Sequence, residues 1–483
     1  LSKRQRKKLH SQAAIAIKKI FQNNLRQVLS TLTFHHYAAT EWQETFYFGQ
    51  QAIIQSFEQS AWGEVVKLGQ LVEEAATILQ ENQEINLADL ALLVDIKNKH
   101  ASALVNLGKL ELALTIAQSA LQLAEKLQDN NLLAQSYGNL SHFGWYQGRF
   151  KDVIIWAEKG LSIAQTAQNK FWQQQLNLQT GRVKLRVAHY KEALFNLTEA
   201  CRLAEELQEE KLLAHAQIFQ GLCLHLLGER QKGFELVENG LALANKLGDS
   251  LFLCRAYSML SVMYFYEYNI DALKEVHKKG VVLSRQIGWR LGEVYQHVYL
   301  GNAYLFEGSF DIDQASNLLQ HALALALEIG DKATTLVIKR GIAKIAALEG
   351  DYLLAINQLK QFVAVLKSFG ELPEQMLTLE ALAQIQESAG EITFAYDTYN
   401  NALEIAQHIG AIHQQWSILF GKARCLFRLG KLEEALENLK LSEKIIKVLL
   451  EGFTDAKDSK YLVEATQSVY QLLRQIQLQN STN

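Results

Sequence analysis

The sequence repeats itself with a period of 40 residues. The same pattern returns in NLGKLELALTIAQSALQLAEKLQD (106–129) and LGERQKGFELVENGLALANKLGD (227–249). A period of this length indicates a repeat architecture, because each unit buries its apolar face only against its neighbours. The turn residues of the successive units are Gly108, Gly148, Ala188, Gly228, Tyr268, Gly308, Gly350, Gly390 and Gly430. One step is 42 residues long, where the turn GSFDIDQA (308–315) carries two extra residues.

Small residues recur in three columns of the repeat: seven residues before the turn, five after it and twelve after it. The first column holds Ala101, Ser141, Gly181, Gly221, Ser261, Gly301, Ala343, Ala383 and Ala423. Small side chains let helix backbones approach closely, and apolar residues three and four positions apart supply a buried stripe. The pattern predicts an all-α, right-handed superhelical solenoid of antiparallel helix pairs.

The joints between units and the chain ends complete this prediction. Gly248-Asp249 and Gly330-Asp331 pair a helix-ending glycine with a helix-starting aspartate. Only Pro373 interrupts the helices, and no alternating strand pattern appears. We expect N-terminal linker or capping hairpins in residues 1–60 and about nine to ten repeats in 61–450. A capping helix and a frayed tail should follow in 451–483.

The composition indicates which partners the protein can bind and in which cellular compartment it folds. The net charge of −3 leaves no electrostatic footprint for nucleic acid or an anionic membrane. Four cysteines without paired or CxxC spacing are typical of buried free thiols in a reducing compartment. The apolar stretch near the N-terminus is too short for a signal peptide. We therefore expect a cytoplasmic protein, and the start at Leu1 rather than Met suggests that it is cut from a larger chain.

No catalytic or metal-binding motif stands out. His35 and His36 are adjacent, so on a helix they diverge, and the same holds for Cys223 and His225, two residues apart. The acidic turn 311–313 lacks the ligand set of a calcium loop. We expect no enzymatic activity, no cofactor and no metal, although an enzyme remains a third hypothesis.

The inward-facing positions of the first helix in each unit offer a candidate binding groove. Five columns, at 13, 10, 6, 3 and 2 residues before the turn, should line it. In these columns stand the aromatic, histidine and basic residues His142, Trp145, Tyr146, Arg182, Arg186, Phe265, Tyr266, Tyr295, Phe306, Arg340, Lys344, Arg424, Phe427 and Arg428. Such a surface suits a protein or an extended peptide, an acidic segment, or a small sugar-like ligand. Packing between units of a tightly wound superhelix explains the same residues equally well.

The small residues on either side of a Gly-containing turn resemble the tetratricopeptide repeat (TPR) over Leu92 to Leu450. Two features depart from that family, the longer 40-residue period and the missing proline between repeats. Both are similar to the long-helix TPR subgroup of bacterial signalling proteins. The resemblance implies a binding surface and leaves the ligand open.

The two ends carry further resemblances. Lys7-Lys8-Leu9-His10, His35-His36-Tyr37 and Trp42 resemble the linker that precedes the TPR sensor arm of STAND signalling ATPases. The C-terminal helix resembles the segment joining TPR arrays to caspase-like CHAT proteases, although a simple cap explains it too. These resemblances imply a sensor or interaction region covalently linked to a nucleotide-binding domain. The alternatives are a CHAT protease regulator and a freestanding peptide-binding adaptor.

Overall fold

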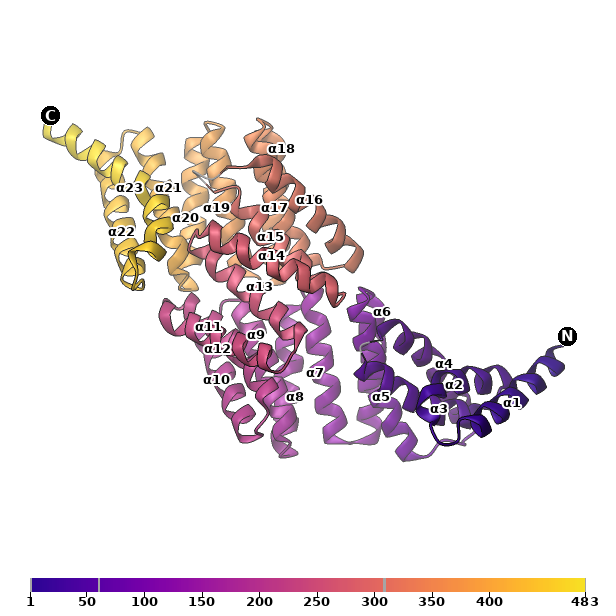
Figure 1. The fold of residues 1–483 in the computed structure, drawn as a ribbon. Helices are drawn as coiled ribbons and strands as arrows, with labels where there is room; N and C mark the ends of the chain where they lie inside the picture. The colour runs from indigo at the N-terminus through magenta and orange to yellow at the C-terminus, as the bar shows by residue number, and fades with distance from the viewer. Residues whose placement is uncertain (1, 60, 307–309, 483) are drawn as a thin grey trace. The chain divides into compact units, whose positions relative to one another are not determined.

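The computed structural model describes residues 2–59, 61–306 and 310–482, and within them it contains 23 α-helices, one 3₁₀-helix and no strand (Figure 1). The elements are α1 (Lys3–Ile20), η1 (Leu25–Val28), α2 (Leu29–Ala39), α3 (Trp42–Glu58), α4 (Trp62–Glu81), α5 (Leu87–Asn106), α6 (Leu110–Leu127), α7 (Asn130–Tyr146), α8 (Phe150–Thr166), α9 (Lys170–Arg186), α10 (Tyr190–Glu206), α11 (Glu210–Leu226), α12 (Arg230–Lys246), α13 (Ser250–Tyr266), α14 (Ile270–Gln286), α15 (Arg290–Ala303), α16 (Ile312–Ile329), α17 (Lys332–Leu348), α18 (Tyr352–Phe369), α19 (Leu372–Ser388), α20 (Ile392–His408), α21 (Ile412–Arg428), α22 (Leu432–Glu451) and α23 (Ala456–Thr482). Consecutive helices pack as pairs, so the predicted all-α solenoid is confirmed.

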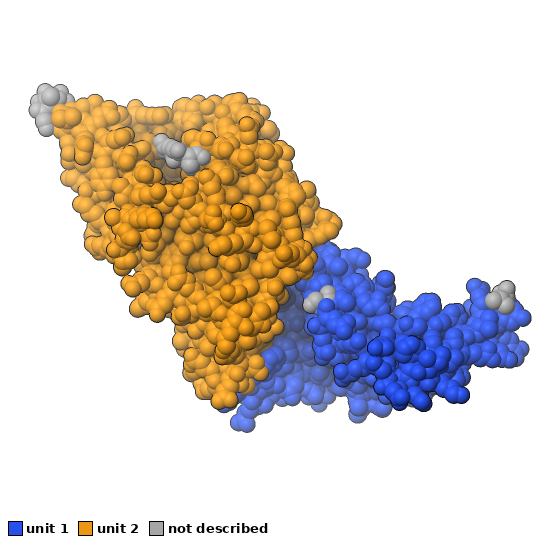
Figure 2. Space-filling view, in the orientation of Figure 1, with its two compact units in different colours: residues 1–147, 155–172 blue, residues 148–154, 173–483 orange. Residues whose placement is uncertain are grey.

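The chain separates into two compact units (Figure 2). Unit 1 comprises residues 1–147 and 155–172, and unit 2 comprises residues 148–154 and 173–483. This division falls inside the predicted repeat region, and the bounds expected at residues 60 and 450 stay predictions. Residues 148–154 join unit 2 because Gly148 packs beside Phe369, where an added Cβ would lie 3.1 Å from the ring. A solenoid has no separate cores, so contacts between distant repeats decide where it divides.

A left-handed residue ends almost every helix. All predicted turn residues have a positive φ, from 59° at Tyr268 to 99° at Gly350, except Gly308, which lies outside the described residues. A second series sits halfway between them, as at Gly248 and Gly410. Each such residue lets the following N–H donate back into the helix end, as Glu229 N–H does to the Leu224 carbonyl (2.9 Å).

The predicted joints are confirmed as helix caps. Gly248 and Gly330 both adopt the left-handed conformation. The side chain of Asp249 accepts a hydrogen bond from the Phe252 N–H at 3.1 Å, and that of Asp331 accepts one from the Thr334 N–H at 3.0 Å. These bonds satisfy backbone donors that the helix start would otherwise leave without partners.

The small columns lie where helix backbones touch. Ala101, Ala343 and Ala423 are completely buried. At Gly221 an added Cβ would lie 2.5 Å from the carbonyl oxygen of Gly233, and a Cβ at Gly233 would lie 2.8 Å from that of Gly221. Because backbone atoms cannot rotate away like a side chain, α11 and α12 can pack at this distance only without side chains there.

The C-terminal helix closes unit 2. Leu462, Val469 and Ile476 of α23 are buried against α21 and α22. Helix α23 continues to Thr482. The frayed tail expected at the end of the chain stays a prediction. None of the described helices combines the length and apolarity needed to cross a bilayer.

Distant repeats of unit 2 touch one another. His413 of α21 approaches the carbonyl oxygen of His225 of α11, with Nε2 at 3.1 Å. Tyr461 of α23 donates from its hydroxyl to a carboxylate oxygen of Asp271 of α14 at 2.5 Å. Within unit 2, α11 therefore contacts α21, and α14 contacts α23, although these helices are far apart in the sequence.

The close approach at Gly221 gives a stability prediction. Gly221→Ala should lower the thermal unfolding midpoint, since forcing a methyl group between two backbones costs about 1–3 kcal/mol. The control is Gly63→Ala at an exposed position of α4, where the added methyl group meets nothing within 4 Å and raises helix propensity. Circular dichroism melts of both variants decide the point, and equal midpoints would contradict the packing argument.

Candidate functional site

A cavity of about 640 Å³ lies in the interior of unit 2. Its walls come mainly from α13, α15, α17, α19 and α21, each the first helix of its pair. Ligand pockets in proteins measure roughly 300–1,000 Å³, so this volume is large enough for several side chains of a peptide or for a small molecule.

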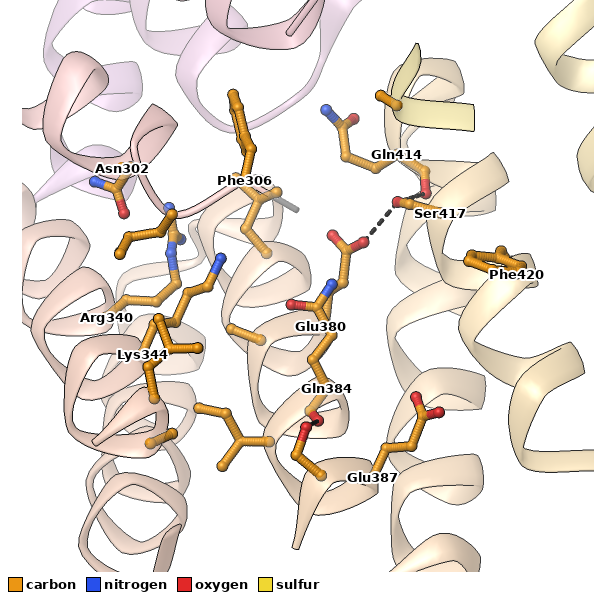
Figure 3. Close-up of a pocket in the computed structure, with 18 of the residues that line it drawn as sticks. Asn302, Phe306, Arg340, Lys344, Glu380, Gln384, Glu387, Gln414, Ser417 and Phe420 are labelled. Atoms are coloured by element: carbon orange, nitrogen blue, oxygen red, sulfur yellow. Dashed lines mark hydrogen bonds between the residues drawn. The ribbon is translucent and has the colours of Figure 1, made fainter. Parts of the chain in front are cut away.

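One side of the cavity is polar. Figure 3 shows Arg340 and Lys344, one turn apart on α17, reaching toward the space that Glu380 of α19 faces. Glu380 accepts a hydrogen bond from the hydroxyl of Ser417 on α21 at 2.6 Å. Burial raises the pKa of Glu380, and the bond from Ser417 opposes this effect. Three consecutive repeats thus contribute to one polar wall.

Another part of the cavity lining is aromatic. The rings of Phe265 and Phe306 lie 4.9 Å apart, and Tyr268 lies 4.8 Å from Phe306. Tyr268 also contacts Trp416, with ring centroids 5.8 Å apart, which joins α13 and the following turn to α21. Rings at these distances form a continuous apolar surface against which a ligand can stack.

Most cations of the cavity already have carboxylate partners. Arg340 is 7% exposed and donates from Nη1 to Oε2 of Glu374 at 2.5 Å. Arg424 pairs with Glu387 at 2.9 Å, and Arg428 approaches the same carboxylate at 3.7 Å. These pairs hold α19 to its neighbours α17 and α21. They therefore stabilise the fold, and these arginines are already neutralised in the absence of a ligand.

Lys344 differs from these arginines. Within the described residues its ammonium makes no hydrogen bond and no ion pair. Burial lowers the pKa of Lys344 to about 8. The nearby Glu380 carboxylate raises this pKa, whereas the Arg340 guanidinium lowers it further. Lys344 is therefore a desolvated cation directed into a cavity, the arrangement from which a ligand anion gains most.

A second charged cluster adjoins the pair of Arg340 and Glu374. Arg186 of α9 forms an ion pair with Glu371, and it approaches Glu374 at 3.8 Å. Burial raises the pKa of Glu371 to about 8, an effect that Arg186 only partly offsets. Burial also opposes ionisation of Glu374, yet Arg340 and Arg186 outweigh it and lower that pKa. The cluster links α9 to α17 and α19.

The structure distributes the predicted groove residues unevenly. Seven of them line the cavity, namely Phe265, Tyr266, Phe306, Arg340, Lys344, Arg424 and Arg428. Arg182 lies over the ring of Phe219, 4.7 Å from its centroid, and Arg186 belongs to the buried cluster. Tyr295 lies near Trp289 and Phe427 packs against the C-terminal cluster.

The remaining three predicted groove residues belong to unit 1. His142 contacts Tyr146 at 5.5 Å, and Tyr146 is only 5% exposed. Trp145 is partly buried on the same helix, α7. They are therefore not residues of the cavity in unit 2.

The histidine and cysteine neighbours of the sequence have separate surroundings. His35 Nδ1 lies 2.9 Å from that of His10, whereas His36 Nδ1 lies 2.6 Å from a carboxylate oxygen of Glu41. Cys223 donates to the carbonyl of Tyr190, while His225 contacts His413. All four cysteines of the chain are buried and free.

Sequence reasoning missed the acceptors and several rings of the cavity. Glu380, Gln384 and Glu387 occupy the columns 10, 6 and 3 residues before the turn at Gly390, and all three line the cavity. Ser417 and Phe420 occupy equivalent positions before Gly430. The column signal was present, but selecting basic, histidine and aromatic residues passed over the carboxylates, the amide and the serine. Phe420 met both criteria and was still left out of the prediction.

No family model and no curated protein matches the sequence. Among solved structures, a Rap protein complexed with competence and sporulation factor superposes with a TM-score of 0.57 at 14% identity, covering 76% of this chain and 99% of that one. A STAND protein with a tetratricopeptide repeat sensor from Pyrococcus horikoshii gives 0.40 at 13%, covering 76% and 54%. Aspartyl phosphate phosphatase F from Bacillus subtilis gives 0.47 at 10%, covering 75% and 94%. The likeness concerns the fold, which is that of a tetratricopeptide-repeat array.

The ion pairs predict unequal effects of two arginines. Arg340→Met leaves the buried Glu374 without its closest partner and should lower the free energy of unfolding by about 3–5 kcal/mol. Arg428→Met removes a half-exposed cation 3.7 Å from its partner and should change it by less than about 1 kcal/mol. Urea unfolding followed by circular dichroism measures both, and a comparable loss in the two variants would contradict the assignment.

Proposed function

We propose that this repeat array is a non-enzymatic binding region, and that its cavity in unit 2 receives an acidic peptide segment of a protein partner. The observation that carries the proposal is Lys344, a cation without a hydrogen-bonding partner among the described residues that reaches into the cavity. A ligand carboxylate there would meet a desolvated ammonium, and hydrogen bonds to charged groups in such sites are about twice as strong as neutral ones.

The charge balance of the lining supports an anionic ligand. The described lining residues include the cations Arg340, Lys344, Arg424 and Arg428 and the carboxylates Glu380 and Glu387. Glu374, which lies behind the lining, pairs with Arg340, so four cations face three carboxylates. Glu387 is neutralised by the arginines of α21. An incoming anion therefore enters a site with surplus positive charge.

The aromatic wall supports a ligand with apolar side chains beside its acidic group. Phe306 and Tyr266 are only partly buried, so their rings keep surface that faces the cavity. Aromatic rings supply large contact area with few rotatable bonds, which lowers the entropy lost on binding. The Rap protein that shares this fold is described as complexed with competence and sporulation factor, so an array of this architecture can hold a partner.

The wider role that we infer is that of a sensor or interaction region in a larger signalling protein of the STAND type. The N-terminal residues Lys7-Lys8-Leu9-His10 and His35-His36-Tyr37 support it by resemblance. The gene sequence beyond both ends tests this role. A phosphate-binding loop upstream would support it. A caspase-like protease domain downstream or a freestanding gene would replace it with the two alternatives named above.

Peptide binding should depend on Lys344. Lys344→Met should weaken binding of a Glu- and Asp-rich peptide library about 10- to 150-fold, because a hydrogen bond to a charged group contributes about 1.5–3 kcal/mol. Lys360→Met on the exposed surface of α18 is the matched control and should bind as the unmodified chain does. Fluorescence polarisation with acidic and charge-reversed libraries gives the affinities. Equal binding of both libraries, or of both variants, would overturn the proposal.

The same binding should weaken in mild alkali. Lys344 carries its charge below a pKa of about 8 and loses it above, so affinity for a carboxylate ligand falls as pH rises through that value, by up to about tenfold per unit. Peptide carboxylates stay ionised over this range. Polarisation titrations from about pH 6.5 to about pH 9.5 should show the decline in the unmodified chain and none in Lys344→Met. The same decline in both would assign the titration to another group.

A further inference from the structure

Three histidines and a carboxylate gather where α14, α15 and α16 of unit 2 meet, away from the residues that line the cavity. Glu293 and His297 are one turn apart on α15, His321 comes from α16 and His277 from α14. Glu293 and His297 are 8% and 4% exposed, whereas His321 is about half exposed. The cluster is thus built into the interface between neighbouring repeats and keeps one side open to solvent.

The donor atoms have the spacing of a metal site. Nε2 of His321 lies 3.1 Å and Nε2 of His297 lies 3.4 Å from Oε1 of Glu293, and one donor atom from each residue lies within 4.8 Å of the other two. Ligands that bind tetrahedral zinc at about 2.1 Å lie roughly 3.4 Å from one another. A single ion can therefore be bound by all three residues with small movements of their side chains.

The fourth residue orients one of the ligands. Nε2 of His277 lies 3.0 Å from Nδ1 of His297, on the ring edge away from Glu293. A hydrogen bond to the second ring nitrogen fixes which nitrogen of a histidine faces a metal, and such partners are a regular feature of metal sites. His277 is therefore a positioning residue.

Arg285 binds the carboxylate of the cluster. Its Nε and Nη2 donate to Oε1 of Glu293 at 2.8 and 2.6 Å. The arginine side chain is 57% exposed, so it can turn into solvent and release the carboxylate. An ion and the guanidinium then compete for Glu293, which means that removing the arginine charge should tighten metal binding.

We propose that Glu293, His297 and His321 bind one divalent transition-metal ion of the Zn²⁺ class, with a fourth position open to water. Two imidazoles and one carboxylate suit Zn²⁺ and its neighbours, whereas Mg²⁺ and Ca²⁺ prefer sites made of oxygens alone. The ion links α15 to α16. Sequence reasoning predicted no metal, because the ligands come from different helices and only the turn-spaced pair Glu293 and His297 is visible in one.

The test is a titration of the chelator-treated full chain with ZnSO₄. Isothermal titration calorimetry measures the binding, and thermal unfolding with and without Zn²⁺ measures the change in midpoint. We expect one Zn²⁺ per chain and a raised midpoint. His321→Ala, at a half-exposed position that the fold tolerates, should abolish this binding. The exposed His408→Ala on α20 is the matched control and should keep it. Zinc binding that survives in His321→Ala, or its absence from the unmodified chain, would overturn the proposal.

Two further variants distinguish a built site from chance surface histidines. His277→Phe should weaken Zn²⁺ binding by about 10- to 100-fold while circular dichroism shows an intact fold, since it removes the partner that orients His297. Arg285→Gln should tighten binding, because it removes the competing charge. Unchanged affinity in both variants would contradict the geometry on which the site rests.

Discussion

The close approach of helix backbones at the small-residue columns is the constraint on which the rest of the structure depends. Where Gly221 and Gly233 face each other, the helices touch through backbone atoms. That contact fixes how each pair is rotated, and a left-handed residue at the end of nearly every helix resets the direction of the chain. With the rotation fixed, the same positions before each turn point inward in every unit. The cavity is lined by Lys344, Gln384 and Arg424 because all three occupy one such column.

This regularity explains how much of the fold could be predicted from the sequence. The turns, the caps at Asp249 and Asp331 and the antiparallel pairs all follow from local patterns that recur. Local patterns were weaker at joints without glycine. Gln128 and Gln208 adopt the left-handed conformation although glutamine gives no signal for it. There the chain is held by the packing of the flanking helices rather than by the preference of the residue.

The candidate site was less predictable, because contacts between repeats decide which of its side chains remain free to bind a ligand. The columns identify which side chains point inward, and Arg186 and Arg340 do so. What the sequence does not reveal is that the solenoid of unit 2 curls until α9 meets α19, which places Glu371 and Glu374 against these arginines. Closure therefore makes Arg186 a support of the fold, and the neighbouring-repeat pair with Glu374 does the same for Arg340. Lys344, one turn further along α17 from Arg340, is left facing the open cavity.

The contact between His225 and His413 joins residues 188 positions apart. A repeat array that touched only its neighbours could settle one hairpin at a time as the chain leaves the ribosome. In unit 2 the inward faces of α11 and α13 instead make their final contacts with α21, which is synthesised much later. Until then, the part of the cavity lining that α21 supplies is missing beside Tyr266 and Phe265. The order of synthesis thus creates a late folding step in which the cavity and the remote contacts form together, and a nascent chain exposes its aromatic surface until then.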